Sequence, residues 1–325
     1  ALGVRHEVQV WDHGPVSGNL MDAARRARMM LIAAWAQERG LAHVALGHTQ
    51  DDQAETLLMG LARAAGIAGL SGMRRQWVEG GVTFHRPLLD IGRADLRGWL
   101  AGQGIGWTED PTNDNPRFTR TRARRVLAAL GPLGISAEGL AEVAGHLAQV
   151  QEALAVQVRA AAAAYVTESA GALRVDAGLW DQPLEVQRQT LARAIGWLSP
   201  EAYLPRAEAL ARFRAALAEG RTATLQGCRC QAGWILREAR DLRGMEAGLW
   251  DGRWQVAGAA GEVRALGAAG LRQCPGWRSL GLPRQVLEVT PALWQGECLI
   301  AAPAAGFGPG SATCTPSFHV ALLSH

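Results

Sequence analysis

The sequence predicts an α/β protein in which an open parallel sheet comes first, followed by a helical region and a small β-rich C-terminal domain. Three observations lead to this prediction. Short apolar runs alternate with amphipathic helical segments over about the first 130 residues, a pattern typical of parallel sheets. Leucines and valines then recur every three or four residues in the middle of the chain. After about residue 222, glycine, tryptophan and short β-like runs dominate.

The first block supplies the elements of the sheet. Strands or extended segments are expected at 6–11, 43–47, 84–89 and 104–110. Helices are expected at 22–38, 50–65 and 94–100, and Gly40 and Gly66 are the expected stops of the first two. Ligands of open α/β sheets bind at the carboxyl ends of strands. The residues that directly follow the strand at 43–47 are therefore where we expect a site.

The remainder of the chain is predicted to be helical and then β-rich. A long amphipathic helix is expected over 140–158, where apolar residues fall at spacings of three and four. Two further helices are expected at 183–198 and 204–219, after an extended run at 173–180. Strand-like runs follow at 222–226, 233–239, 253–258 and 298–303. We divide the chain into the segments 1–131, 132–165, 166–221 and 222–325.

Composition excludes several classes of protein. No apolar run reaches the roughly 20 residues that cross a bilayer, and the N-terminus lacks the pattern of a signal peptide, so we expect a cytoplasmic protein with no membrane partner. The five cysteines are an odd number without a C-x-x-C pair, which argues against a zinc site and a disulfide framework. All 33 basic residues are arginine, so arginine must supply any cationic contact to phosphate.

Residues 47–58 (GHTQDDQAETLL) place one histidine and three carboxylates at helical spacing directly after a strand. His48 and Asp52 are four residues apart, and so are Asp51 and Glu55, which puts their side chains on adjacent rows of one helical face. Carboxylates suit both Mg²⁺ and a substrate ammonium group. The alternative is an ordinary acidic first turn, capped by the preceding threonine, with Glu55 in solvent.

An arginine run lies in the segment 117–125, which contains five arginines and no acid. Its members are Arg117, Arg120, Arg122, Arg124 and Arg125. Such a density of guanidinium groups suits phosphate, although a solvated helix face has the same composition. Arg86, at the end of an extended segment, is expected to meet a carboxylate of the acidic cluster or a nucleotide phosphate.

Two motifs resemble a known family. The pattern H-x-x-D-D-x-x-E-T, which begins at His48, resembles the second signature of the PP-loop ATP pyrophosphatases that modify tRNA. Residues 86–125 contain R-P-L-L, E-D-P-T-N and the arginine run, and they resemble the tRNA(Ile)-lysidine synthetase family. The resemblance is strongest over residues 1–130. It implies a PP-loop fold of the adenine nucleotide alpha hydrolase type.

The resemblance also implies a reaction and its partners. The reaction is ATP-dependent ligation of L-lysine to C2 of the wobble cytidine of tRNA(Ile) with a CAU anticodon, through an adenylated intermediate. ATP and Mg²⁺ are the implied cofactors, and a homodimer is a further expectation. Segment 1–131 would be the catalytic domain, 132–165 a helical connector, 166–221 a helical tRNA-recognition region and 222–325 a β-rich C-terminal domain.

Residue roles follow from the same resemblance. The implied catalytic residues are His48, Asp51, Asp52 and Glu55, of which Asp51 and Asp52 would also bind the metal. The implied ATP contacts are Arg86, Arg120 and Arg122. The implied tRNA contacts are Arg117, Arg124 and Arg125.

One family motif has no counterpart in the sequence. The phosphate loop S-G-G-x-D-S, which follows the first strand in the family, does not occur. We therefore expect a chain that is N-terminally incomplete, lacks the first strand and this loop, and is inactive by itself. Two alternatives stay open. One is a non-catalytic tRNA-binding remnant, and the other is a different PP-loop tRNA-modifying enzyme such as a thiolase, which the lack of C-x-x-C disfavours.

Overall fold

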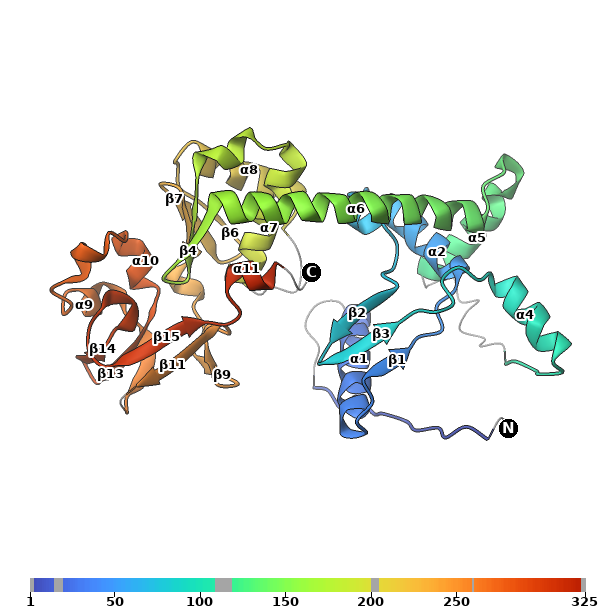
Figure 1. Cartoon of the computed structure of the whole chain (residues 1–325), viewed down its shortest axis with the longest axis horizontal. Coiled ribbons are helices and arrows are strands. Elements are labelled where there is room, and N and C mark those ends of the chain that lie inside the picture. Colours follow the sequence, from blue (N-terminus) through green and yellow to red (C-terminus); the bar gives the residue numbers. More distant parts are fainter. Residues whose placement is uncertain (1–2, 15–19, 109–118, 200–204, 259, 323–325) are drawn as a thin grey trace. The chain divides into compact units, whose positions relative to one another are not determined.

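The computed structural model describes residues 3–14, 20–108, 119–199, 205–258 and 260–322. The chain divides into two compact units, Ala1–Glu152 and Ala153–His325. Figure 1 shows the first unit in blue to green and the second in green to red. The mixed α/β organisation, with β-rich sheets toward the C-terminus, confirms the predicted fold class.

The first unit contains a sheet whose described strands follow the order β1 (His43–Ala45), β3 (Val82–His85) and β2 (Gln76–Glu79). β1 and β3 are parallel, with Val44 opposite Phe84. β2 and β3 are antiparallel. Gly80 and Gly81 join them with positive φ angles of 54° and 72°, the conformation that a two-residue hairpin turn requires.

Helices make up the rest of the first unit's regular structure in the described residues. They are α1 (Leu20–Glu38), α2 (Gln50–Leu61), α3 (Ile67–Leu70), α4 (Arg93–Gly102) and α5 (Thr119–Leu130), followed by the 3₁₀ turn η2 (Gly131–Leu133). α1 packs on the sheet through Ala33 and Ala36, which share a core with Val82 and Phe84. α2 begins shortly after β1 and packs against α5. This pairing brings the acidic motif and the arginine run together.

The expected strand at 6–11 does not form, so this prediction is wrong. The segment has no regular secondary structure, and Val8 and Val10 are 74% and 77% exposed. Its attachment to the unit is through side chains, because Glu7 accepts hydrogen bonds from Trp35 Nε1 at 2.8 Å and Arg39 Nη2 at 2.5 Å. The alternating pattern is that of a strand, but no described strand lies beside it to pair with its backbone.

Two other expected elements differ from the structure. Residues 104–108 form no strand, and the end of that expected segment lies outside the described residues. The helix expected over 50–65 ends at Leu61. Ala64 adopts a positive φ of 50°, which a continuing helix does not allow, and Gly66 then caps the start of α3.

Helix α6 (Ala137–Tyr165) is longer than the expected 140–158 and runs through the point where the two units divide. Alanine-rich sequence continues the helix at its C-terminal end. Within the described residues, no single helix has the length and apolar character to cross a membrane. One pair of helical segments, 119–133 and α6, is long and apolar enough when taken together, but the chain bends by 102° between them.

The second unit begins with a five-stranded sheet in which every described pairing is antiparallel. Its strands, in spatial order, are β4 (Val166–Ser169), β5 (Ala172–Val175), β8 (Trp234–Arg237), β7 (Cys228–Gln231) and β6 (Ala223–Leu225). Helices α7 (Leu184–Leu198) and α8 (Ala207–Ala218) share its core, which includes Leu173, Ile195, Phe213 and Ile235. Residue 222, where the sequence analysis starts the last segment, therefore falls within this sheet: β4 and β5 precede it, and the other three strands follow it.

Smaller elements complete the second unit. One sheet has the order β15 (Gly310–Cys314), β11 (Trp254–Gly258), β10 (Leu249–Trp250) and β9 (Met245–Glu246). Another has the order β12 (Glu262–Ala265), β13 (Pro291–Gln295) and β14 (Cys298–Ala301). The short helices are α9 (Gly267–Leu271), α10 (Arg284–Glu288) and α11 (Phe318–Ala321). The 3₁₀ turns are η3 (Ala177–Asp181), η4 (Ala239–Asp241), η5 (Trp277–Leu280) and η6 (Pro303–Ala305).

A buried ionic cluster links two of these sheets. Asp251, 1% exposed, follows β10 and accepts a hydrogen bond from Arg237 Nε of β8 at 3.0 Å. Arg253 lies 3.4 Å from the same carboxylate oxygen and donates to the carbonyl of Gly171 at 2.8 Å. Because each charge is paired inside the fold, the cluster fixes β8 against the turn between β10 and β11.

Candidate active site

The three carboxylates of the acidic motif lie in α2, which begins shortly after β1. His48 precedes the helix, so the expected place of His48 on the same helical face is wrong. Thr49 is the N-cap residue of α2. Its backbone N–H and its hydroxyl group both donate to Asp52 Oδ2, at 2.8 and 2.9 Å. Burial alone would raise the pKa of Asp52, but the hydrogen bonds from Thr49 and the charges of Arg93 and Arg120 bring that pKa below its usual value. Asp52 is therefore an anion at neutral pH.

Glu55 lies one turn further along α2 and is 1% exposed. Its Oε1 accepts a hydrogen bond from Arg124 Nε of α5 at 2.6 Å, and Arg93 Nη2 of α4 is 3.4 Å from the same oxygen. Its other oxygen, Oε2, is buried and has no hydrogen-bond partner within the described chain. A buried carboxylate oxygen without a donor is an unfilled position for a cation or an N–H group.

Asp51 makes a different contact. Its Oδ2 accepts a 2.7 Å hydrogen bond from the backbone N–H of Arg93, the first residue of α4. This bond satisfies one of the free amides at the start of that helix. It also places the Arg93 side chain, whose Nη2 lies 3.6 Å from Asp52 Oδ1. Asp51 thus joins α2 to α4.

Arg93 is a member of the site that sequence reasoning missed. It lies inside the stretch 86–125 that carries the family resemblance, and in sequence it looks like an ordinary residue at the start of a helix. Only the folded chain, in which the first residue of α4 lies against the start of α2, shows that Arg93 contacts both Asp52 and Glu55. No local pattern in the sequence indicates that contact.

His48 is held by Arg86. Arg86 Nε donates to His48 Nδ1 at 3.1 Å, and Arg86 Nη1 donates to the carbonyl of Arg74 at 2.6 Å. The guanidinium also lies over the ring of Trp77, 4.1 Å from its centroid. Arg86 is 7% exposed, and in this structure its partners are a histidine, a carbonyl and an indole, not the expected carboxylate.

The environment of His48 keeps its imidazole neutral. Burial and the positive charge of Arg86 lower the pKa of His48 to about 4. Because Nδ1 accepts the hydrogen bond from Arg86, the proton of the neutral ring is on Nε2. Burial and the charges of Arg25 and Arg120 lower the pKa of Arg86 to about 10, so Arg86 stays charged at neutral pH.

The arginine run divides between two faces of α5. Arg120 Nη1 lies 3.7 Å from Asp52 Oδ1, and Arg124 pairs with Glu55, so these two face α2. Arg122 and Arg125 are exposed, and Arg122 Nη2 donates to Thr119 Oγ1 at 3.2 Å. Arg117 lies outside the described residues. The structure therefore brings two members of the run into the acidic cluster and leaves two at the surface.

The assembled cluster is rich in positive charge. It contains one more arginine than carboxylates, and His48 is neutral. The arginines are Arg86, Arg93, Arg120 and Arg124, and the carboxylates are Asp51, Asp52 and Glu55. Within the described residues no three metal-ligating side chains converge. The arrangement suits a ligand that brings its own negative charge, such as a nucleotide polyphosphate, together with a cation.

Comparison with known proteins identifies relatives of this chain. A family model described as a PP-loop domain matches residues 1–130. The tRNA(Ile)-lysidine synthase of Ruegeria pomeroyi is 42% identical over 339 residues, covering 100% of this chain and 81% of that protein. Proteins of the same name from Bradyrhizobium diazoefficiens and Rhodopseudomonas palustris are 43% and 42% identical, over 48% and 47% of this chain. The chain covers 43% and 44% of those two proteins. These names favour the ligase interpretation over a thiolase or a non-catalytic remnant.

Proposed function

Since the chain belongs to the tRNA(Ile)-lysidine synthase family, we propose that it takes part in ATP-dependent ligation of L-lysine to C2 of the wobble cytidine in a tRNA(Ile) with a CAU anticodon. In the first step the C2 oxygen attacks the α-phosphate of ATP and pyrophosphate leaves. In the second step an amine of lysine attacks C2 and AMP leaves. The observation that supports this proposal best is the cluster of carboxylates and arginines at the start of α2.

We propose that Arg120, with the charge of its neighbouring arginines, receives the phosphates of ATP. Arg120 is the strongest candidate, because it is partly exposed and its 3.7 Å contact with Asp52 is longer than a hydrogen bond. Arg86 supports the site through His48 and contributes charge without a phosphate contact of its own. Guanidinium groups fit the developing charge of pyrophosphate by both geometry and charge.

The same cluster fits a magnesium ion that is held partly by phosphates. Mg²⁺ in nucleotide sites commonly takes one or two protein carboxylates and completes its shell with phosphates and water. Asp52 Oδ1 and the free oxygen of Asp51 are the donors we assign to it. When bound, the ion supplies neutralisation of the phosphate charge. Arg93 and Arg120 lie beside Asp52, so the ion fits only together with phosphates that offset their charge.

We assign the lysine ammonium group to Glu55. Its Oε2 is buried and has no donor within the described chain, and its carboxylate is held in place by Arg124 on the opposite oxygen. A cation at Oε2 would supply the missing donor. His48, neutral and carrying its proton on Nε2, is the candidate for orienting a substrate oxygen.

For tRNA we assign the exposed face of α5. Arg122 and Arg125 lie there without an acidic neighbour in the run, and Arg117 belongs to the same run in sequence. The resemblance implied an ATP contact for Arg122, but we assign it to tRNA because it faces away from the acidic cluster. Arg124, which the sequence suggested for tRNA, is engaged by Glu55, so we assign it to positioning that carboxylate. Segment 1–131 is then the catalytic domain, and the parts that follow are proposed to bind the body of the tRNA.

The proposal is tested by incorporation of radiolabelled lysine into a tRNA(Ile) transcript with a CAU anticodon, using the protein as its gene encodes it. We expect incorporation that requires ATP and releases AMP. Asp52→Asn and Glu55→Gln should abolish it, whereas Glu142→Gln, an exposed residue of the same unit, should retain it. Sulfur transfer in place of lysine would establish a thiolase, and tRNA binding without ATP consumption would establish a non-catalytic protein.

A further inference from the structure

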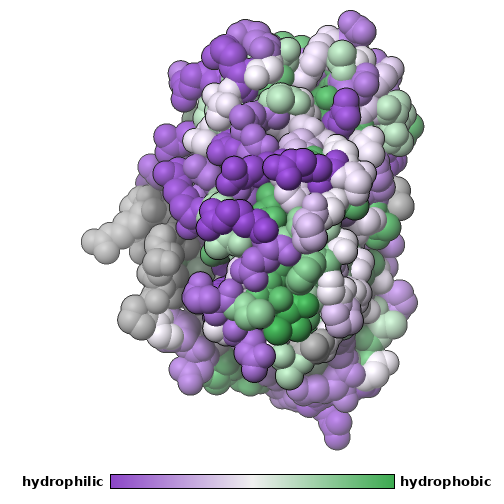
Figure 2. Space-filling view, turned by 90° about the vertical axis from the view of Figure 1, so that its left-hand side faces the viewer, coloured by the Kyte–Doolittle hydropathy of each residue, from purple (hydrophilic) through white to green (hydrophobic). Residues whose placement is uncertain are grey.

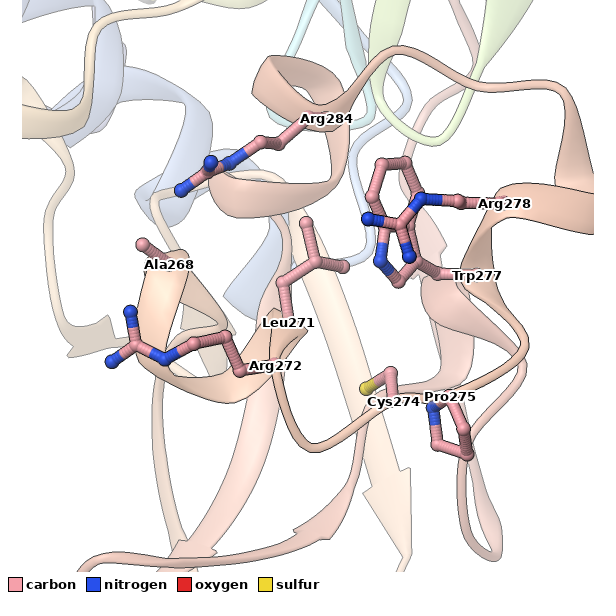
Figure 3. Close-up of a pocket in the computed structure, with 8 residues that line it drawn as sticks. All are labelled: Ala268, Leu271, Arg272, Cys274, Pro275, Trp277, Arg278 and Arg284. Carbon is pink, nitrogen blue, oxygen red and sulfur yellow. The ribbon is translucent and has the colours of Figure 1, made fainter.

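A second basic site lies in the second unit, between α9 and α10. A hollow of about 400 Å³ is lined there by Ala268, Leu271, Arg272, Cys274, Pro275, Trp277, Arg278 and Arg284. In Figure 3 the side chains of Arg272 and Arg284 lie on one side of this hollow, and those of Trp277 and Arg278 lie on the other. Figure 2 shows hydrophilic side chains around a hydrophobic patch on the face that carries these elements.

The floor of the hollow is apolar and uncharged. Leu271 and Cys274 are 3% and 2% exposed and belong to the core of this part of the unit. The Cys274 thiol donates to the carbonyl of Gly270 at 3.5 Å, and burial raises its pKa. The thiol therefore stays protonated and contributes no negative charge. Trp277 is half-buried against the same core.

The rim is strongly basic. Among the described residues that line the hollow, three are arginines and none is acidic. Arg284 Nε pairs with Glu288 of the same helix at 2.6 Å and is itself 58% exposed. The side chain of Arg272 is exposed and has no ion-pair or hydrogen-bond partner in the described part of the chain. Guanidinium groups gathered around one hollow repel one another unless an anion neutralises them.

The third arginine adds a flat surface. The guanidinium carbon of Arg278 lies 4.8 Å from the centroid of a Trp277 ring, which is a cation–π contact. A stacked arginine and tryptophan present planar faces on which a nucleobase can stack. The volume is within the range of sites for small organic ligands. Phosphate contacts on one side and a stacking surface on the other are the two requirements of a nucleotide.

We propose that this hollow binds a nucleotide, with its phosphate between Arg272 and Arg284 and its base against Arg278 and Trp277. The ligand chemistry is a phosphate group attached to a nucleoside. It can come from a single-stranded nucleotide of an RNA or from a free nucleoside monophosphate. The proposal rests on the residues of the hollow and does not require the ligase reaction, so the two can fail independently.

The test compares charge-matched double variants of the full chain. Arg272→Gln/Arg284→Gln removes two guanidiniums from the hollow. Arg212→Gln/Arg240→Gln removes two exposed guanidiniums of the same unit, with side chains 69% and 72% exposed. Calorimetric titration with AMP should show at least tenfold weaker binding for the first variant and unchanged binding for the second. Asp52→Asn serves as a third comparison, because it alters any AMP site in the first unit but not this one.

Two further measurements separate phosphate from base and RNA from free nucleotide. Trp277→Leu should weaken binding of AMP at this site while leaving binding of inorganic phosphate unchanged. If the source is RNA, Arg272→Gln/Arg284→Gln should lower the log–log salt dependence of tRNA binding by about one unit for each phosphate that these arginines neutralise. Loss of AMP binding with an unchanged tRNA salt dependence identifies a free nucleotide. Equal binding of AMP and tRNA by both double variants would overturn the proposal.

Discussion

Arg124 of α5 donates a hydrogen bond of 2.6 Å to Glu55 of α2, a residue 69 positions earlier in the chain. The carboxylate is 1% exposed, whereas the arginine side chain is 31% exposed. The contact therefore places an anion inside the unit and leaves part of its counter-charge at the surface. It also turns one oxygen of Glu55 toward α5 and leaves the other without a donor in the described chain.

This pairing predicts a stability cost for Glu55→Gln. Removing the charge takes the Glu55 anion from Arg124 and Arg93, but Arg93 keeps its contact with Asp52 and both arginines reach water. We therefore expect a loss of about 1–3 kcal/mol, less than for a fully buried pair. The double variant Glu55→Gln/Arg124→Gln should recover part of that loss, because the two residues are coupled. Urea unfolding measures both, and Glu142→Gln is the control. A Glu55→Gln protein as stable as the wild type would contradict the pairing.

The low pKa of His48 predicts a pH dependence of stability. Its folded pKa is about 4 and the usual value is about 6.5, so between these values the unfolded chain takes up a proton that the folded chain does not. The free energy of unfolding should therefore fall as the pH drops from 6.5 toward 4. His48→Asn keeps an acceptor for Arg86 and removes the titration. From unfolding curves at pH 7, 6, 5 and 4.5, the free energy of unfolding of the wild type minus that of His48→Asn should fall as the pH drops. A difference that stays constant with pH would show that His48 does not titrate as expected.

The exposed face of α5 predicts an effect on RNA binding alone. Arg122→Gln/Arg125→Gln should weaken tRNA binding and reduce its log–log salt dependence by about one to two units, because each phosphate that is no longer neutralised lowers the slope by about 0.7–0.9. Thermal stability should stay unchanged, since both residues are exposed. Filter binding over a salt series gives the slope. Arg63→Gln/Arg74→Gln, two exposed positions outside α5, is the charge-matched control, and an equal slope in both variants would remove α5 from the tRNA surface.

The buried ionic cluster of the second unit predicts a large structural effect. Asp251→Asn leaves Arg237 and Arg253 with unpaired charges at positions that are 3% and 4% exposed. We expect a loss of about 3–5 kcal/mol, seen as faster hydrogen exchange in β8 and β11. Glu297→Gln, whose side chain is 93% exposed beside Arg264, should change stability by no more than about 0.5 kcal/mol. Comparable effects of the two substitutions would mean that the cluster contributes little.

Local spacing in the sequence determined which residues share a surface. The four-residue interval of Asp51 and Glu55 depends only on helix geometry, and α2 carries both residues. His48 lies before the first residue of α2, so the prediction that it shares a helical face with Asp52 is wrong. The alternation of strands and helices, the long middle helix and the β-rich C-terminal part followed from periodicity in the same way. The resemblance carried by His48 and the stretch 86–125 identified the family that the comparisons confirm.

Tertiary packing decided the partners of those residues. Arg93 meets Asp52 and Glu55 only because the first residue of α4 lies against the start of α2. Arg86 contacts His48 because their two segments lie side by side after β1 and β3. The segment 6–11 has the pattern of a strand but forms none, since a strand needs a neighbour that its own sequence does not specify. Charge balance and pKa depend on burial and on contacts across many residues, and these arise only when the chain is folded.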